Sequence, residues 1–578
     1  MSNRNYQKAI QPIALATACL VGLTSAGAVA YAAGIETPPS AGAIQRQLQP
    51  AKPLPLPPAA VLSLPQPSRL RSSSTVQIPV RQITIHGNTL LPAARLAALV
   101  KPAEGRTMSL AQLEQMVDGI TQAYHRAGYP LSYAYLPQQQ IRNGSVRVDI
   151  VEARYGTISV TGHSKLKPAV ALRTVGVAAG EIITEARLTR GLILLSQTPG
   201  VAAHAVFSPG EQPQTSKLQL QLHDTPRFVG DLNVSNNGNK AVGSTLIGAG
   251  GAFNDPFGYG SAVSVNAMMT PRNTARLDAG GLAFTSPYIW NGLRAGAYGS
   301  FTNYHLGEKF AALNESGRAD QAGLDATYPV LLAPGRSLVV RVDVLRNWLS
   351  QSSATLASRE NDAITMERLS LGGSYADTHG GITQADVSLS HGELGISGAA
   401  AQANNAAGPR TAGGFNVVAL QLVRTQALAD EFMLQAAVSG QIADKNLDSS
   451  QKFYLGGPNG VIGYAVGDGG GDDGYLGSLE LSHPVPLRRV PGALRASLLA
   501  QYGMIRVNHH DYPAYGARND LTEAALGAKL SYAWQGWHLT SSYGWRIGSY
   551  ARSGAASTSG GEFWLNIGKT FQGLEGSD

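Results

Sequence analysis

Hydrophobic and polar residues alternate over most of the C-terminal part of the chain, from Phe228 onward. Stretches of about ten alternating residues are separated by glycine, proline, asparagine and aspartate, and no long helical period interrupts them. In one such stretch, from Val340 to Val344, valine alternates with a charged residue. This pattern is typical of transmembrane barrel strands, of which we count about sixteen, although a soluble β-sandwich produces similar alternation. The length of the pattern without a domain-like break favours the barrel.

Two units of mixed helix and strand precede this region. In the first, apolar residues recur every three or four positions after Ser109, which predicts a helix with one buried face. Ser109 and Gln112 form the capping-box pattern that begins such a helix, and Gly128 and Pro130 end it. The other expected elements are a strand through Val80, Ile83 and Ile85, a short helix at 92–100, and strands at 131–136 and 144–152.

The second unit repeats the same order in a shorter form. Its expected elements are a strand at 158–160, helices at 168–175 and 184–197, and strands at 201–207 and 217–223. Leu218, Leu220 and Leu222 alternate strictly in the last strand. Each unit therefore has the order βααββ. Each is expected to leave a strand edge and a helix groove exposed, to which an extended peptide can add as another strand.

The first 30 residues have the pattern of a secretory signal peptide. Basic residues precede an apolar run at 13–23, and small residues follow it, with cleavage expected after Ala30 or Ala32. An uncleaved anchor is disfavoured because glycine and serine interrupt the run before the roughly 20 residues that span a bilayer. The single cysteine, Cys19, lies within the apolar run, so the exported chain would contain none.

Residues 31–75 are expected to form a linker that carries a short helix. Ser40 is the expected N-cap of a helix over 40–49, and Pro50 ends it. Four prolines between 53 and 58 then impose an extended spacer that cannot pack as a core. A wholly disordered leader is the alternative on the sequence alone.

Composition and charge exclude several classes of function. The formal net charge of +7 is spread along the chain, so no nucleic-acid partner is expected. No segment after the leader offers about 18 uninterrupted apolar residues, so a membrane role would require a barrel. No Ser/His/Asp or paired-carboxylate arrangement stands out, and we therefore expect neither an enzyme nor a cofactor.

A glycine-rich segment at 454–477 is nearly uncharged before its three aspartates. Asp468, Asp472 and Asp473 resemble one calcium-binding repeat, but such sites need tandem copies. A phosphate-binding loop is disfavoured because no Gly-Lys-Ser/Thr is present. His509 and His510 could ligate a metal, yet adjacent residues of a strand point to opposite faces. We therefore expect no metal site.

This organisation, with the segments "PSAGAIQRQLQP", "GAGGAFNDPFGYG" and "LGGPNGVIGY", resembles the TpsB family, the outer-membrane transporters of two-partner secretion (haemolysin-activator/secretion type). The resemblance covers essentially the whole chain. It implies a mainly β fold: a C-terminal sixteen-stranded transmembrane β-barrel with two N-terminal periplasmic α+β POTRA domains of order βααββ. The expected boundaries are 1–30 for the signal peptide, 31–75 for the plug helix and linker, 76–153 and 154–226 for the POTRA domains, 227–571 for the barrel and 572–578 for a tail. The strand ending at Phe571 is expected to close the barrel.

The resemblance also implies a function. The chain would be a pore in the bacterial outer membrane that captures an unfolded secreted partner, a TpsA-type exoprotein, on its periplasmic POTRA domains and exports it without nucleotide hydrolysis. Outer-membrane lipids, lipopolysaccharide and the barrel assembly machinery are the other expected partners. One alternative is an assembly factor that inserts other barrels, which would more often carry a longer periplasmic array. The other is a passive porin, which would not need two βααββ modules.

The family's sixth extracellular loop is implied to fold back into the pore and to carry the motif Val-Arg-Gly-Tyr/Phe. Here the motif stands as Val461, Ile462, Gly463 and Tyr464, so its arginine is missing. In the family that arginine pairs with an aspartate of a Phe/Gly-x-Asp-x-Gly motif on the barrel wall.

The best match to the wall motif is Leu499, Gln501 and Gly503, so the aspartate is replaced by glutamine. The loop arginine and the wall aspartate are thus both replaced by uncharged residues. Replacing only one of them would leave an unpaired charge in a partly desolvated lumen, which is costly. We therefore expect the loop to fold inward, held by packing of Tyr464 and by hydrogen bonds of the Gln501 amide. Such an uncharged attachment should be weaker than an ion pair and less sensitive to salt.

Overall fold

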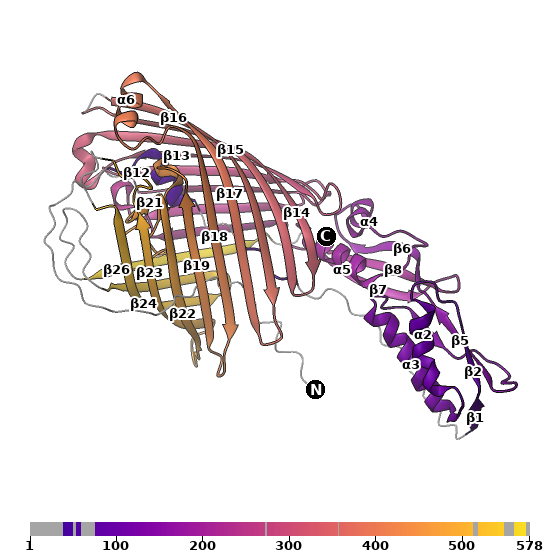
Figure 1. Cartoon of the computed structure of the whole chain (residues 1–578). Helices are drawn as coiled ribbons and strands as arrows, with labels where there is room; N and C mark the ends of the chain where they lie inside the picture. The colour runs from indigo at the N-terminus through magenta and orange to yellow at the C-terminus, as the bar shows by residue number, and fades with distance from the viewer. Residues whose placement is uncertain are drawn as a thin grey trace.

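The computed structural model describes residues 38–49, 54–58, 76–271, 274–355, 358–512, 518–547 and 560–573. The predicted signal peptide, most of the linker and most of the C-terminal tail lie outside these ranges. A large barrel forms one end of the molecule, and two small modules extend from it as an arm (Figure 1). None of the described helices is long and apolar enough to cross a membrane.

The first module contains two small sheets and two main helices. Strand β5 (Ser145–Val151) lies between β2 (Gln82–His86), which is parallel to it, and β4 (Tyr133–Tyr135), which is antiparallel. Helices α2 (Ala93–Val100) and α3 (Leu110–Arg126) form one hydrophobic core with these strands. The predicted capping box is present, because Ser109 and Gln112 each accept a backbone hydrogen bond from the other.

The structure corrects one prediction for the first module. The expected first strand is divided into β1 (Gln77–Val80) and β2, and β1 pairs with a strand that was not predicted, β3 (Arg106–Ser109). Val80 and Ile83 are both buried although they are three positions apart, and a straight strand would place them on opposite faces. The chain therefore bends at Arg81, whose N–H donates to the Gly144 carbonyl oxygen (2.7 Å).

The second module has the predicted order of elements. Strand β8 (Thr215–Asp224) lies between β6 (Arg154–His163) and β7 (Val201–Pro209), and helices α4 (Pro168–Val175) and α5 (Glu185–Ser196) complete the fold. The three leucines that alternate in β8 are all buried in the module's core. The alternation in the sequence therefore predicted the inner face of this strand correctly.

Helix α5 joins the second module to the barrel. A terminal nitrogen of Arg190 donates to the carbonyl oxygens of Pro329 (2.7 Å) and Asn291 (2.9 Å) at the near rim. Leu194 of the same helix packs against Leu332. The arm is thus attached to the barrel by hydrogen bonds to the backbone and by an apolar contact.

The barrel is closed and has sixteen antiparallel strands, which confirms the predicted number. The strands are β9 (Phe228–Ser235), β10 (Leu246–Asn254), β11 (Ala262–Met269), β12 (Arg276–Thr285), β13 (Arg294–His305), β14 (Glu315–Ala333), β15 (Arg336–Ser353), β16 (Ser358–Ala376), β17 (Gly381–Ser397), β18 (Gly413–Ala427), β19 (Met433–Ala443), β22 (Asp473–Val485), β23 (Ala493–Arg506), β24 (Asp520–Trp534), β25 (Trp537–Arg546) and β26 (Gly561–Gln572). Strand β26, which contains Phe571, pairs with β9 and closes the ring.

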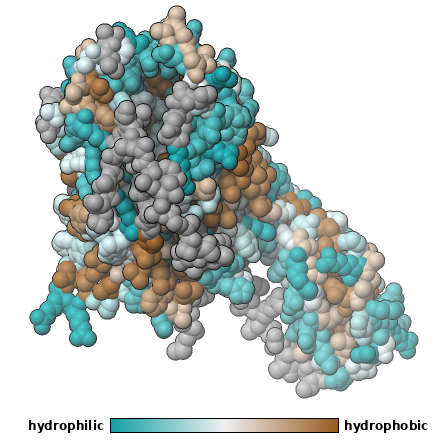
Figure 2. Space-filling view, turned by 60° about the vertical axis from the view of Figure 1, so that its left-hand side comes forward, coloured by the Kyte–Doolittle hydropathy of each residue, from teal (hydrophilic) through white to brown (hydrophobic). Residues whose placement is uncertain are grey.

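Alternate residues of each strand face the lumen and the outside. In β15, Val342 and Val344 are 44% and 46% exposed, whereas Asp343 between them is buried on the lumen side. Figure 2 shows hydrophobic residues gathered on the outer wall of the barrel. An apolar exterior around a polar interior is the arrangement expected of a barrel in a lipid bilayer.

Glu152, which follows β5, holds the first module together through a buried network. Its carboxylate accepts hydrogen bonds from the backbone N–H groups of Thr89 (2.6 Å) and Leu90 (2.8 Å) and from the Tyr124 hydroxyl (2.9 Å). Burial alone would raise the pKa of Glu152, but these bonds and one from the Thr89 hydroxyl outweigh it, so the pKa lies below its ordinary value.

We predict that Glu152→Ala destabilises the first module by about 2–4 kcal/mol, because several buried donors lose their acceptor. Hydrogen exchange at the Thr89 and Leu90 amides in the full chain measures this, and both should exchange faster. The control is Asp149→Ala, which removes an ion pair with the half-exposed Arg147 (2.6 Å) and should have little effect. Equal exchange in the two variants would contradict the assigned role.

The lowered pKa also predicts an acid response of the first module. The fold stabilises the ionised form of Glu152, so its contribution is complete above the ordinary carboxyl pKa. The contribution is lost as the pH falls through the lowered pKa. Protection of the Thr89 amide should decline in that acid range in the wild type, and Glu152→Ala should abolish this pH dependence.

Candidate functional site

The segment between β19 and β22, residues 444–472, turns back into the barrel and is called here the lumen loop. Its two legs pair at β20 (Phe453–Tyr454) and β21 (Gly470–Gly471). Its apolar residues form a buried cluster with side chains of the barrel wall: Leu455, Val461, Ile462 and Tyr464 from the loop, with Ile505, Ala525 and Trp564 from the wall. The segment is apolar because it packs against an apolar part of the wall.

The tip of the lumen loop is a tight turn that requires glycine. The Val461 N–H donates to the Leu455 carbonyl oxygen (2.7 Å), which brings the chain back on itself. A Cβ atom at Gly460 would lie 1.8 Å from that oxygen, and Gly457 has a φ of 114°. No other residue type fits position 460 without moving the backbone.

Wall side chains bind both backbone polar groups of Ile462. The Ile462 N–H donates to Oε1 of Gln501 on β23 (2.8 Å), and its carbonyl oxygen accepts from Nε1 of Trp564 on β26 (2.8 Å). A Cβ atom at Gly544 would lie 2.5 Å from the Ile462 carbonyl carbon, and one at Gly527 would lie 3.0 Å from the Ile462 side chain. The wall therefore has a hollow shaped by two glycines, and Ile462 fills it.

The three residues of the wall motif face the lumen from alternate positions of β23. Leu499 and Gln501 are buried there. At Gly503 a Cβ atom would lie 2.5 Å from Cδ2 of Leu455, so the absence of a side chain makes room for the loop. The structure thus brings the predicted loop motif and wall motif together.

The expectation of an attachment without charge was wrong for the lumen loop as a whole. The contact between Ile462 and Gln501 is neutral. Nε of Arg546 on β25, however, donates to the Gly463 carbonyl oxygen (2.7 Å), and its guanidinium carbon lies 5.1 Å from the centre of the Tyr464 ring. A charged donor makes a stronger hydrogen bond than a neutral one.

Arg546 and Trp564 were not identified from the sequence. They contact loop residues that are 83 and 102 positions away along the chain. No local spacing signals such contacts, because the barrel register alone brings these strands to the loop.

The predicted short helix, α1 (Ala41–Leu48), lies inside the barrel, where it is drawn in indigo (Figure 1). Ser40 caps it, as expected, by accepting from the Ala43 N–H. The Ala41 N–H donates to Oε1 of Gln351 on β15 (3.2 Å), and Oε1 of Gln47 accepts from Asn239 (2.8 Å). The helix is therefore held at its start by a wall side chain and near its end by Asn239, in the connection between β9 and β10.

Helix α1 also touches the lumen loop. A Cβ atom at Gly42 would lie 2.7 Å from the Ser450 Cβ, in the short helix η4 (Ser449–Gln451) at the start of the loop. At the other end, a Cβ atom at Gly467 would lie 2.9 Å from the Gln47 amide. The helix and the loop thus form one body in the lumen, and glycines make the close approach possible.

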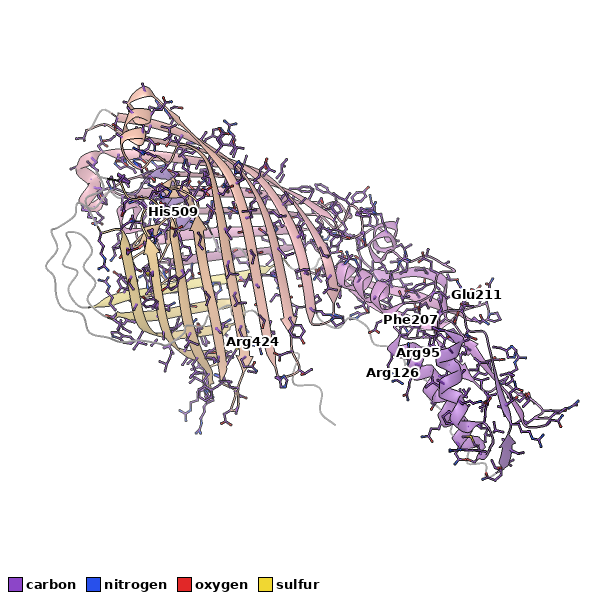
Figure 3. All side chains as sticks on the ribbon, in the orientation of Figure 1. Arg95, Arg126, Phe207, Glu211, Arg424 and His509 are labelled. Atoms are coloured by element: carbon purple, nitrogen blue, oxygen red, sulfur yellow. The ribbon has the colours of Figure 1, made fainter. Side chains whose placement is uncertain are left out.

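Two of the three aspartates in the glycine-rich segment hold the return leg of the lumen loop. Asp472 is paired with Nζ of Lys452 on the other leg (2.6 Å) and accepts from the backbone N–H of His509 at the rim (2.9 Å). Asp473, the first residue of β22, is paired with Nδ1 of His509 (2.8 Å). His509 lies at the end of the barrel away from the arm (Figure 3). The described residues contain no group of three or more His, Cys, Asp or Glu side chains placed to hold a metal ion. These aspartates therefore anchor the loop.

A cavity of about 1150 Å³ remains between helix α1, the lumen loop and the wall. Arg46 of the helix and Asp343, Asn347 and Arg368 of the wall are among its lining residues. The helix and the loop thus obstruct the lumen without filling it.

Two protein families match parts of the chain. Residues 214–530 match the haemolysin secretion/activation protein family ShlB/FhaC/HecB, and residues 78–153 match the ShlB-type POTRA domain. Among individual proteins, the chain is 26% identical over 504 residues to the heme/hemopexin transporter protein HuxB of Haemophilus influenzae, covering 86% of this chain and 88% of HuxB. It is 23% identical to the outer membrane transporter CdiB of Dickeya dadantii, covering 83% and 85% of the two chains. The solved structure of CdiB from Escherichia coli has the same fold, with a TM-score of 0.71 and 16% identity over 89% of this chain and 94% of CdiB.

We predict that Gly42→Val displaces helix α1, because the added side chain overlaps the backbone and side chain of Ser450. Single-channel conductance in planar bilayers should rise. The matched control is Gln49→Val, an exposed position directly after the helix, which should leave conductance unchanged. Wild-type conductance in the Gly42 variant would show that the helix does not obstruct the lumen.

Proposed function

Because the chain belongs to the haemolysin secretion/activation family ShlB/FhaC/HecB, it exports a partner protein across the outer membrane by two-partner secretion, and we propose that helix α1 and the lumen loop close its pore at rest. The two modules are POTRA domains, which are periplasmic in this family. Members of the family are transporters. The proposal for this chain accordingly contains no catalytic step.

One observation carries the proposed resting state. The lumen loop and helix α1 lie inside the barrel and contact each other, and wall side chains bind backbone groups of both. A polypeptide cannot pass while both remain in place, because only a limited cavity is left. Export therefore requires the helix, the loop or both to move.

The partner is proposed to bind as an unfolded chain on the arm. Strand β7 lies at one edge of its sheet, and Val206 on it is 40% exposed. Phe207 of the same strand is labelled on the arm in Figure 3. An extended peptide can add to such an edge through backbone hydrogen bonds, which tolerate many sequences. The proposal also includes contacts with lipopolysaccharide and with the barrel assembly machinery during insertion.

A haem-related exoprotein is the first cargo to test. The basis is the similarity to HuxB, which is named a heme/hemopexin transporter protein. Secretion of such an exoprotein by cells with and without this chain is the direct assay, and no difference between the two would direct the search to other exoproteins.

We predict that linking the loop motif to the wall stops export. The variant carries Ile462→Cys and Gln501→Cys, whose parent residues are joined by a 2.8 Å hydrogen bond, and is treated with a short thiol crosslinker. The natural chain has one cysteine, within the predicted signal peptide, so the introduced thiols should react selectively. Crosslinked pores should fail to secrete a co-expressed partner.

Each single-cysteine variant, treated identically, is the control and should still secrete. Full secretion by the crosslinked pore would mean that the lumen loop need not leave the wall. Failure of the crosslink to form in a variant that still secretes would mean that the loop does not lie at the wall.

A further inference from the structure

The side chain of Arg546 lies where the loop motif meets the last strands of the barrel. It extends from the end of β25 and is 15% exposed. Its Nε donates to the Gly463 carbonyl oxygen (2.7 Å), and its guanidinium faces the ring of Tyr464 (5.1 Å). One cation of the wall therefore contacts two residues of a loop motif that contains no charge of its own.

A second set of contacts holds Arg546 from the opposite side. A terminal nitrogen of its guanidinium lies 3.4 Å from Oε1 of Glu562 on β26. The same carboxylate is paired with Nζ of Lys240 (3.0 Å), in the short helix η2 (Lys240–Val242) between β9 and β10. Lys240 therefore lies across the seam at which β26 and β9 close the barrel.

The Lys240–Glu562 pair lies beyond the backbone pairing of this seam. The regular pairing of β26 with β9 ends at Asn566 and Ser235, and Asn566 lies four positions after Glu562 along the chain. Beyond it, Asn236 hydrogen-bonds to Leu565 and Phe563, and the Lys240–Glu562 pair then joins the two sides through side chains. The carboxylate that orients Arg546 is thus fixed by a cation from the other side of the seam.

A buried carboxyl group lies behind the lumen loop, on the strand that pairs with β25. Glu523 on β24 is fully buried, and neither of its carboxylate oxygens has a hydrogen-bond partner among the described residues. It lies against the lumen loop, because a Cβ atom at Gly469 would be 2.9 Å from its Oε1. Its strand β24 pairs with β25, with Ala525 opposite Arg546. Glu523 and Arg546 therefore lie on neighbouring strands beside the loop.

We propose that Arg546 is the positioning residue of the lumen loop, and that Glu562 and Lys240 hold Arg546 in place from the closing seam. The inference rests on the proposed resting role of the loop. It adds that the position of an uncharged loop motif depends on a charge that the wall supplies. The attachment should therefore respond to salt, contrary to the expectation from the motif alone.

The test measures how often the loop leaves the wall. Val461→Cys places a thiol at a fully buried position of the loop, and the rate at which a maleimide labels it in proteoliposomes reports its exposure. Adding Arg546→Met keeps an unbranched side chain but removes the guanidinium. Loss of a charge-assisted hydrogen bond should raise the labelling rate about tenfold.

Three further variants separate positioning from a general loss of structure. Arg546→Lys keeps the charge and should label more slowly than Arg546→Met. Glu562→Gln should give a smaller increase than Arg546→Met. Arg495→Met, on β23, removes an arginine that donates to the Ser482 hydroxyl oxygen (3.1 Å) on β22, and should leave the rate unchanged. Heat-resistant migration in gels verifies that each barrel is folded.

Salt gives the readout that a merely structural role would not change. High salt should raise the labelling rate in the Val461→Cys parent, and it should have no effect once Arg546→Met is added. Equal rates for the parent and Arg546→Met, or for Arg546→Lys and Arg546→Met, would overturn the inference and leave the proposed function intact. Fast labelling of the parent itself would overturn both.

Discussion

Inside a bilayer every backbone N–H and C=O must find a partner within the protein, and the pairing of β26 with β9 supplies the last of these partners. The alternation of outward apolar and inward polar residues, seen at Val342 and Asp343, is useful only in a ring that has closed. Closure also encloses a lumen, in which helix α1 and the lumen loop lie. The helix, the lumen loop and their contacts with the wall are consequences of that constraint.

The lumen is obstructed by segments that are bound to the wall at few points. Ile462 enters a hollow between Gly527 and Gly544, and its backbone groups are satisfied by Gln501 and Trp564. Helix α1 approaches the loop closely through Gly42. An arrangement of this kind is specific without being strong, because a handful of hydrogen bonds and apolar contacts can be exchanged for contacts with an arriving polypeptide. That balance suits a pore in which the helix and the loop are proposed to move aside for export.

Features that depend on local sequence could be predicted, and features that depend on barrel register could not. Alternation predicted the strand number, and the pattern around Ser109 predicted a capped helix. The bend at Arg81 was missed because it rests on a hydrogen bond to Gly144, far along the chain. Arg546 was missed for the same reason: its partner Gly463 is brought to it only when β25 takes its place in the ring. The loop motif and the wall motif were identified by resemblance, and the cation that completes their contact was not part of either.

In the resting pore, the lumen loop is bound to the barrel wall. Hydrogen exchange of the backbone amide of Ile462, in the wild-type chain in a lipid bilayer without partner, tests this most directly, because that N–H donates to Gln501. Exchange should be slower by orders of magnitude than in an unstructured segment. Exchange at the unstructured rate would contradict it.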